Sequence, residues 1–197
     1  MSISFQILLG LNDPRSPFAA IQFYPERETE NVFRVCTLIY TIASNLFSDT
    51  LCRYVKQTSL SFEHKGLITY FGMMPEGLKD DGLLFCYNQL RNNCGIPQHK
   101  NGWGFPPETD DHSLAACIDR IMIQRNAITD SMKFGLSESV FHQILCKLRD
   151  DILEIEQQVI GGDEYKERVD VFLAMSINQL IAVNYVGKRN MFLVEFL

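Results

Sequence analysis

Arg125 and Asn126 form a basic and polar pair inside a segment whose regularly spaced residues are otherwise apolar. Those apolar residues recur at steps of three and four, so Arg125 is predicted to fall on the apolar face of a helix. A guanidinium there is costly unless it is paired or opens onto a cleft, which makes it a candidate binding or catalytic group. The alternative is a structural Arg that packs along its neighbours or pairs with Asp80, Asp81 or Asp119.

Two cysteines and two histidines suggest a metal site by their types and number. Zn²⁺ is commonly held by four such ligands in a tetrahedral arrangement. The spacing fits no common zinc pattern, and the helical pattern places both cysteines on inner faces. Buried reduced thiols are the alternative that we favour, and we expect no cofactor. The four candidate ligands are Cys94, His99, His112 and Cys117.

A long loop rich in glycine and proline, GIPQHKNGWGFPPETDD, separates two predicted helices. It holds Phe105 and Trp103, the only tryptophan of the chain. Aromatic side chains beside prolines are good anchors for a partner protein, so both are candidate binding residues. The alternative is a helix connection that packs both rings under the bundle, because large aromatic side chains are usually mostly buried.

Other classes of site find little support. The chain has no G-x-S-x-G, Walker-type Gly-Lys-Ser, G-x-G-x-x-G or H-E-x-x-H motif, and no paired Cys/His array of the RING type. Its formal charge of -6 argues against a broad surface for nucleic-acid phosphates, since Lys and Arg side chains must neutralise them. The remaining histidines, His64 and His142, are isolated in the sequence.

Five amphipathic helices are predicted to position these residues, because apolar residues recur at helical spacing between glycine and proline breaks. We expect Ser137 to cap the fourth helix and Gly161-Gly162 to end it. The fifth helix is predicted to turn Tyr165, Val169, Phe172, Leu173 and Leu180 inward. The predicted helices cover Glu28–Val55, Leu83–Cys94, Leu114–Ser131, the stretch from Ser137 to Val159, and Asp163–Val183.

The ends of the chain read differently from its middle. Residues 1–30 form an irregular lead-in with three prolines, 31–160 the helical domain, and 161–197 a further helix with an apolar tail that packs on the bundle. KGLITYF has strand-like content but is interpreted as a connection, with a small hairpin partner at an end of the chain as the alternative. The final MFLVEFL is apolar and strand-like, so irregular or short strand additions are expected at the ends.

Composition favours a cytoplasmic protein. Six scattered cysteines without a C-x-x-C pair indicate reduced thiols, and the N-terminus lacks the basic region of a signal peptide. No apolar run approaches the length that crosses a bilayer, so no membrane partner is expected.

Three runs in order, LLFCYNQLRNNCGI, GWGFPPETDDHSLAACIDRI and RNAITDS, together with a closing amphipathic helix, carry a family resemblance. They resemble the HEPN-like domain of the DAZ-interacting zinc-finger ubiquitin ligase and of many invertebrate multidomain proteins. The similarity covers about residues 30–160. It implies an all-α bundle of four to five helices that pairs as a dimer, with the helices bearing Arg125 and Asn126 near the symmetry axis.

The resemblance also implies a test for activity. Catalytic HEPN proteins carry an Arg, a polar residue, and a His four to six residues after the Arg, and they act on RNA without a metal. Arg125 and Asn126 match the first two, but Ser131 stands at the His position and no His lies in the window. A serine has no group that titrates near neutral pH, so the main proton carrier is missing.

We therefore expect a non-catalytic HEPN-like interaction module that self-associates or binds a protein or RNA partner, in a stress or innate-immune system as related domains do. One alternative is a metal-independent ribonuclease that uses Arg125 and Asn126 with another proton carrier. The other is a structural domain whose partner is the rest of a longer polypeptide.

Overall fold

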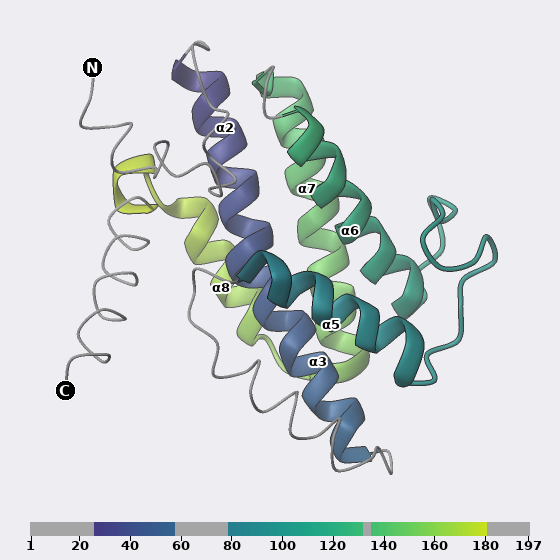
Figure 1. Ribbon diagram of the computed structural model, residues 1–197. Helices are drawn as coiled ribbons and strands as arrows, with labels where there is room; N and C mark the ends of the chain where they lie inside the picture. The colour runs from purple at the N-terminus through teal and green to yellow at the C-terminus, as the bar shows by residue number, and fades with distance from the viewer. Residues whose placement is uncertain (1–25, 58–78, 132–134, 181–197) are drawn as a thin grey trace.

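The computed structural model describes three stretches of the chain, which are drawn as coloured ribbons in Figure 1. They are residues 26–57, 79–131 and 135–180.

The first stretch is one continuous helix. α2 (Glu26–Thr37), the π-helical segment η1 (Leu38–Ala43) and α3 (Ser44–Gln57) follow one another with helical backbone angles at both junctions (Figure 1). The π segment is mostly buried, and π-helical turns of this kind occur as short insertions inside α-helices. The predicted helix Glu28–Val55 is confirmed.

Four more helices complete the described bundle. α5 and α6 are joined by the long loop, and α6 and α7 lie side by side (Figure 1). A second π segment, η3, extends α7, and the last helix packs against α7 and η1. Their bounds are α5 Lys79–Asn93, α6 Leu114–Ser131, α7 Glu138–Ile155, η3 Glu156–Ile160 and α8 Glu164–Ala174.

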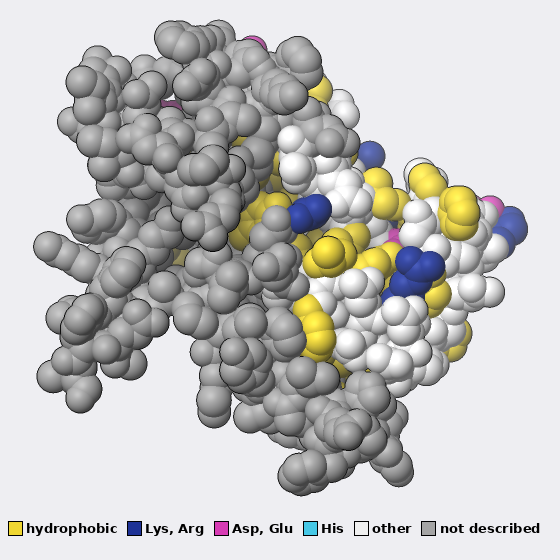
Figure 2. Space-filling view, viewed as in Figure 1, with side chains coloured by type: hydrophobic (Ala, Val, Ile, Leu, Met, Phe, Trp, Pro, Cys, Tyr) yellow, Lys and Arg dark blue, Asp and Glu magenta, His cyan; other side chains and the backbone are white. Residues whose placement is uncertain are grey.

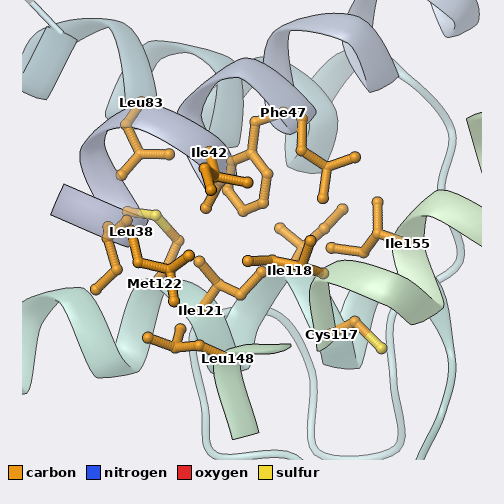
Figure 3. Packing of buried hydrophobic residues seen from close by; sticks show 14 of the residues in the cluster. Leu38, Ile42, Phe47, Leu83, Cys117, Ile118, Ile121, Met122, Leu148 and Ile155 are labelled. Carbon is orange, nitrogen blue, oxygen red and sulfur yellow. The ribbon is translucent and has the colours of Figure 1, made fainter. Parts of the chain in front are cut away.

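One apolar core joins the helices. Side chains from the long first helix, α5, α6 and α7 point toward one another in Figure 3. Ile118 and Ile121 of α6 meet Leu38 and Phe47 of the first helix there, and none of the four exposes more than 1% of its surface. Burying such side chains is the main favourable term in folding. The chain is therefore an all-α bundle, as the helical spacing predicts, while the strands expected at the ends lie outside the described residues.

The expectation that no segment is long and apolar enough to cross a bilayer is wrong by length and composition. The helix Arg27–Val55 passes that test, because uncharged polar residues interrupt its apolar ones without adding charge. In the bundle, 67% of its most apolar stretch is buried. The core helix of a soluble protein passes the same test, so this is weak evidence for a membrane span.

The predicted fifth helix is too long. α8 ends at Ala174, and Met175 has an extended backbone. Ser176 and Gln179 explain the break: the Gln179 side chain accepts from Ser176 N at 2.8 Å while the Ser176 hydroxyl accepts from Gln179 N at 3.4 Å. This reciprocal pair is a capping box, which starts a new helical turn. Tyr165, Val169, Phe172 and Leu180 are buried as predicted, but Leu173 is 36% exposed.

The turn between α7 and α8 depends on one buried carboxylate. Gly161 and Gly162 end the helix as predicted, with φ of 72° and 100°. Ser137 stands at the N-cap of α7 as predicted, although its side chain makes no capping bond. Glu156, 2% exposed, accepts from Tyr165 N at 2.6 Å and Lys166 N at 3.0 Å. It thus satisfies two amides that the first turn of α8 leaves free.

Replacing Glu156 with Ala should lower the free energy of unfolding by about 1–3 kcal/mol, because two amides lose a charged acceptor. Urea unfolding followed by circular dichroism measures it. The neighbouring Gln157 is exposed, so Gln157→Ala is the control and should stay within about 0.5 kcal/mol of the wild type. Equal effects of the two substitutions would contradict the capping role.

Candidate functional site

A buried carboxylate on α6, Asp119, joins α5 and the long loop to the bundle. Its residue is 1% exposed, and three donors reach it. The Tyr87 hydroxyl donates to Oδ1 at 2.7 Å, while Oδ2 accepts from Gly104 N at 2.8 Å and lies 2.9 Å from His99 Nε2. Because a carboxylate only accepts, His99 donates through Nε2. We call Asp119, Tyr87, His99 and Gly104 the Asp119 cluster.

Gly104 has to be glycine for this cluster to form. Its φ is +84°, a conformation that side chains with a Cβ rarely adopt. A Cβ at this position would also lie 3.3 Å from Nη1 of Arg91. The loop therefore turns its Gly104 amide inward onto Asp119 while the Arg91 guanidinium lies beside the turn.

The two aromatic residues of the loop take opposite positions. The Trp103 ring is partly buried against the core and meets the Tyr87 ring edge-on, with centroids 6.2 Å apart. Phe105, two residues later, is 64% exposed. The expectation that the rings pack under the bundle therefore describes Trp103 and not Phe105.

Tyr87 is held as a hydrogen-bond donor. Burial, reinforced by the bond to Asp119, raises the pKa of Tyr87 to about 12. Deprotonation would place two negative charges in contact in a buried site, which is strongly unfavourable. The phenol therefore stays protonated and donates to Asp119 throughout the neutral range.

A second buried pair ties the end of the loop to α7. Arg120 Nη2 lies 2.7 Å from Asp151 Oδ1, and Arg120 Nη1 donates to the Asp111 carbonyl at 2.7 Å. The Asp151 side chain is only 6% exposed. Burial raises the pKa of Asp151 to about 6, against the opposing effect of the Arg120 guanidinium.

The exposure of side chains on α6 differs between the two halves of the helix. In its first half α6 is buried at every position except the half-buried Arg120, and in its second half it exposes Asn126, Ala127 and Thr129. Arg125 is half-buried, and its Nη1 donates to Asn126 Oδ1 at 3.0 Å in an exposed contact. The predicted apolar stripe is therefore buried, and the candidate pair lies where α6 emerges from the bundle.

Of the three carboxylates predicted as alternative partners of Arg125, the structure describes the side chain of Asp119 alone. The carboxylate of Asp119 serves donors from α5 and the loop, as described above. The side chains of Asp80 and Asp81 lie outside the described residues, as does that of Ser131, which is the last residue of α6. The nearest histidine after Arg125 in the sequence is His142 on α7, whose exposed ring lies 3.0 Å from Glu138.

The four candidate zinc ligands are not gathered into a site. No group of three or more His, Cys, Asp or Glu side chains that could hold a metal occurs among the described residues. His99 belongs to the Asp119 cluster, and the exposed His112 lies 3.7 Å from Glu154. Burial raises the pKa of Cys94 to about 11 and that of Cys117 to about 12, so both thiols are protonated near neutral pH.

The similarity of the chain to a known protein family shows which family it belongs to. Residues 80–182, just over half of the chain, match the family described as DZIP3/hRUL138-like HEPN. The chain belongs to this HEPN family. The resemblance found in the sequence is confirmed, but its range moves toward the C-terminus: the match starts in α5 and ends beyond α8, whereas about residues 30–160 are predicted. No curated protein and no solved structure is similar enough to count as a match.

Sequence reasoning missed the Asp119 cluster of this HEPN domain. It treated His99 as a metal candidate and Asp119 as a partner for Arg125. One signal was present: Asp119 is the single acidic residue between Ala115 and Met122, in the half of α6 that is otherwise apolar apart from Arg120. A carboxylate at such a position needs several donors, and a loop rich in glycine can supply a backbone amide.

Replacing Asp119 with Ala should cost about 3–5 kcal/mol of stability, because it leaves buried donors without an acceptor. It should also shift the emission of the only tryptophan, Trp103, to longer wavelength at native conditions as the loop comes away from Tyr87. Fluorescence and urea unfolding read both effects. Asp110 is an exposed acidic residue of the same loop, and Asp110→Ala should change neither. An unshifted spectrum in a folded Asp119→Ala protein would contradict the anchoring role.

The raised pKa of Asp151 predicts a dependence of stability on pH. The folded state binds the proton of the Asp151 carboxyl group more tightly than the unfolded chain does. The stability that this proton contributes is therefore fully present below about pH 4 and is lost as the pH rises through about 6. In Asp151→Asn the decrease in unfolding free energy over this window should be smaller than in the wild type. Urea unfolding at a series of pH values measures the slope, and an unchanged slope would contradict the assignment.

Proposed function

We propose that this chain is a non-catalytic HEPN module of the cytoplasm that self-associates or binds a partner through the second half of α6, with Arg125 and Asn126 as contact residues. One observation carries the proposal. α6 is buried in its first half and exposes Asn126, Ala127 and Thr129 in its second half, beside the half-buried Arg125.

The chemistry of this surface supports binding rather than catalysis. The Arg125 guanidinium bonds to the amide of Asn126, which orients a fixed charge and a hydrogen-bonding group toward solvent. No imidazole follows in the sequence window of the catalytic HEPN pattern, since Ser131 stands there. Metal-free RNA cleavage needs a group that can accept and return a proton near neutral pH, and neither Arg nor Asn can do so.

The surface also supports association of modest strength. Ala127 is small, so two copies of α6 can approach closely at that point, while Asn126 and Thr129 can hydrogen-bond across such a contact. An isologous contact places the same patch on both sides of a two-fold axis, so two Arg125 side chains would face each other unless each is paired. Asn126 Oδ1 accepts from each guanidinium but is neutral, so this repulsion stays in place and keeps the association modest.

The competing function is a ribonuclease that recruits a distant proton carrier. His142 is its only described candidate on α7, and there the ring lies against Glu138 at the start of that helix. A third reading, a structural domain of a longer polypeptide, uses the same α6 surface with an intramolecular partner.

Sedimentation of the purified chain over a range of concentrations should show a monomer–dimer equilibrium. Reversing the charge in Arg125→Glu should shift it toward monomer by at least about tenfold in the dissociation constant, the effect of about 1.4 kcal/mol. Arg53 is an exposed arginine on α3, so Arg53→Glu is the matched control and should leave the equilibrium unchanged.

The same preparations distinguish binding from catalysis. Labelled structured RNA should stay intact with the wild-type chain. Cleavage that is present in the wild type and lost in Arg125→Ala would overturn the non-catalytic proposal. A chain that stays monomeric at every concentration would contradict self-association and leave an intramolecular or different partner for the α6 surface.

A further inference from the structure

The tip of the α5–α6 loop exposes an aromatic ring among charges of both signs. Phe105 is the most exposed of the large apolar side chains in the described part of the chain, at 64%. The same loop and the end of α5 carry four exposed charged side chains, Arg91, Lys100, Glu108 and Asp110. Figure 2 shows apolar, basic and acidic side chains close together at the side of the molecule where this loop lies in Figure 1. We call these five residues the loop patch.

Contacts within the loop hold its charged residues close to one another, and Arg91 lies beside the turn that precedes Phe105. Lys100 Nζ lies 2.6 Å from Glu108 Oε1, and the charge of Asp110 also acts on Lys100. Arg91 reaches the Tyr87 hydroxyl and the Gly104 turn, which immediately precedes Phe105. The patch is therefore formed by α5 and both ends of the loop.

The loop is rigid where it carries Phe105. The Asn101 side chain donates to the Pro106 carbonyl at 2.8 Å, Phe105 N donates to the Gly102 carbonyl at 3.3 Å, and Gly104 is held by the Asp119 cluster. Pro106 and Pro107 restrict the backbone further. A loop ordered before binding loses little conformational entropy when a partner docks, so an exposed ring on it is a better anchor than one on a loose segment.

The charges of the patch identify the kind of partner. Two basic and two acidic residues accompany Phe105, so the patch is close to neutral although the chain carries a formal charge of -6. A strongly basic or strongly acidic partner, including the phosphates of RNA, would be repelled by half of these groups. Lys100 and Glu108 are paired within each copy, so Arg91 and Asp110 are the charges that a second copy of the same patch can pair, which is the self-complementarity that a two-fold contact requires.

We propose that the loop patch is a self-association surface, in which Phe105 of one copy packs against Phe105 of a second copy with Arg91 of each facing Asp110 of the other. This deepens the proposed function, because it names a second surface for the same kind of partner. Two different two-fold contacts on one chain, one through α6 and one through the loop patch, do not close at a dimer. The chain would then assemble beyond two copies.

Charge reversal within the patch gives the most direct test. Arg91→Glu leaves the patch with three acidic residues and one basic residue, and Asp110→Lys leaves the opposite excess. Each variant alone should lose the association that depends on the loop patch, while an equimolar mixture should regain it because the two altered patches attract each other. Loss in both variants without recovery in the mixture would overturn the charge arrangement.

Substitution of the ring tests the anchor in the same sedimentation measurement. Phe105→Ala should reduce assemblies larger than the dimer by at least about tenfold, and Phe105→Leu should restore part of them. Val171, 55% exposed on α8, supplies the control: Val171→Ala should behave like the wild type. Thermal unfolding and Trp103 emission confirm that each variant keeps the fold.

The outcomes separate this inference from the proposed function. If Phe105→Ala sediments like the wild type while Arg125→Glu dissociates the dimer, the loop patch is not a self-association surface and the α6 proposal stands. If Phe105→Ala alone converts a wild-type dimer into a monomer, the loop patch is the interface and the α6 proposal is contradicted. A wild type that stays monomeric overturns the loop-patch inference and the self-association part of the proposed function, and it leaves a different partner for the α6 surface.

Discussion

The carboxylate of Asp119 is the interaction on which the arrangement of this HEPN domain depends. Removing a carboxylate from water costs several kcal/mol, so one that is 1% exposed persists only where fixed donors replace the water. Here the donors come from α5, from the start of the loop and from its tightest turn. Satisfying one charge therefore fixes α5 and two points of the loop against α6. The position of Phe105, which immediately follows that turn, is a consequence.

The helices could be predicted from the sequence because their signals are local. Repeats of apolar residues every three to four positions located all five described helices, and Gly161 and Gly162 marked one end correctly. The predicted end of the fifth helix is wrong because a local capping signal was not used. Ser176 and Gln179 form a capping box that is visible in the sequence, yet the fifth helix was extended through it. Leu173 lies within α8, but it was predicted on the inner face and is 36% exposed.

The site was less predictable because it is made by contacts across the loop. Nothing near His99 in the sequence indicates that its ring meets Asp119, and nothing separates the partly buried Trp103 from the exposed Phe105 two residues later. The difference between the two rings accompanies the positive φ at Gly104, which lies between them and directs its amide inward onto Asp119. The family resemblance supplied what the local patterns could not: it predicts the HEPN family, which the match over residues 80–182 confirms, and it assigns Arg125 and Asn126 to a HEPN motif without its histidine, which stays a prediction.

α6 thus has two roles along one helix: its first half holds the bundle together, and its second half carries the surface that we assign to association. Hydrogen exchange of the backbone amides, compared between dilute and concentrated samples of the wild-type chain, tests this division most directly. The account predicts added protection on concentration in residues 123–129 and none in α8. Protection that does not change in the second half of α6, or that increases in α8 instead, would contradict it.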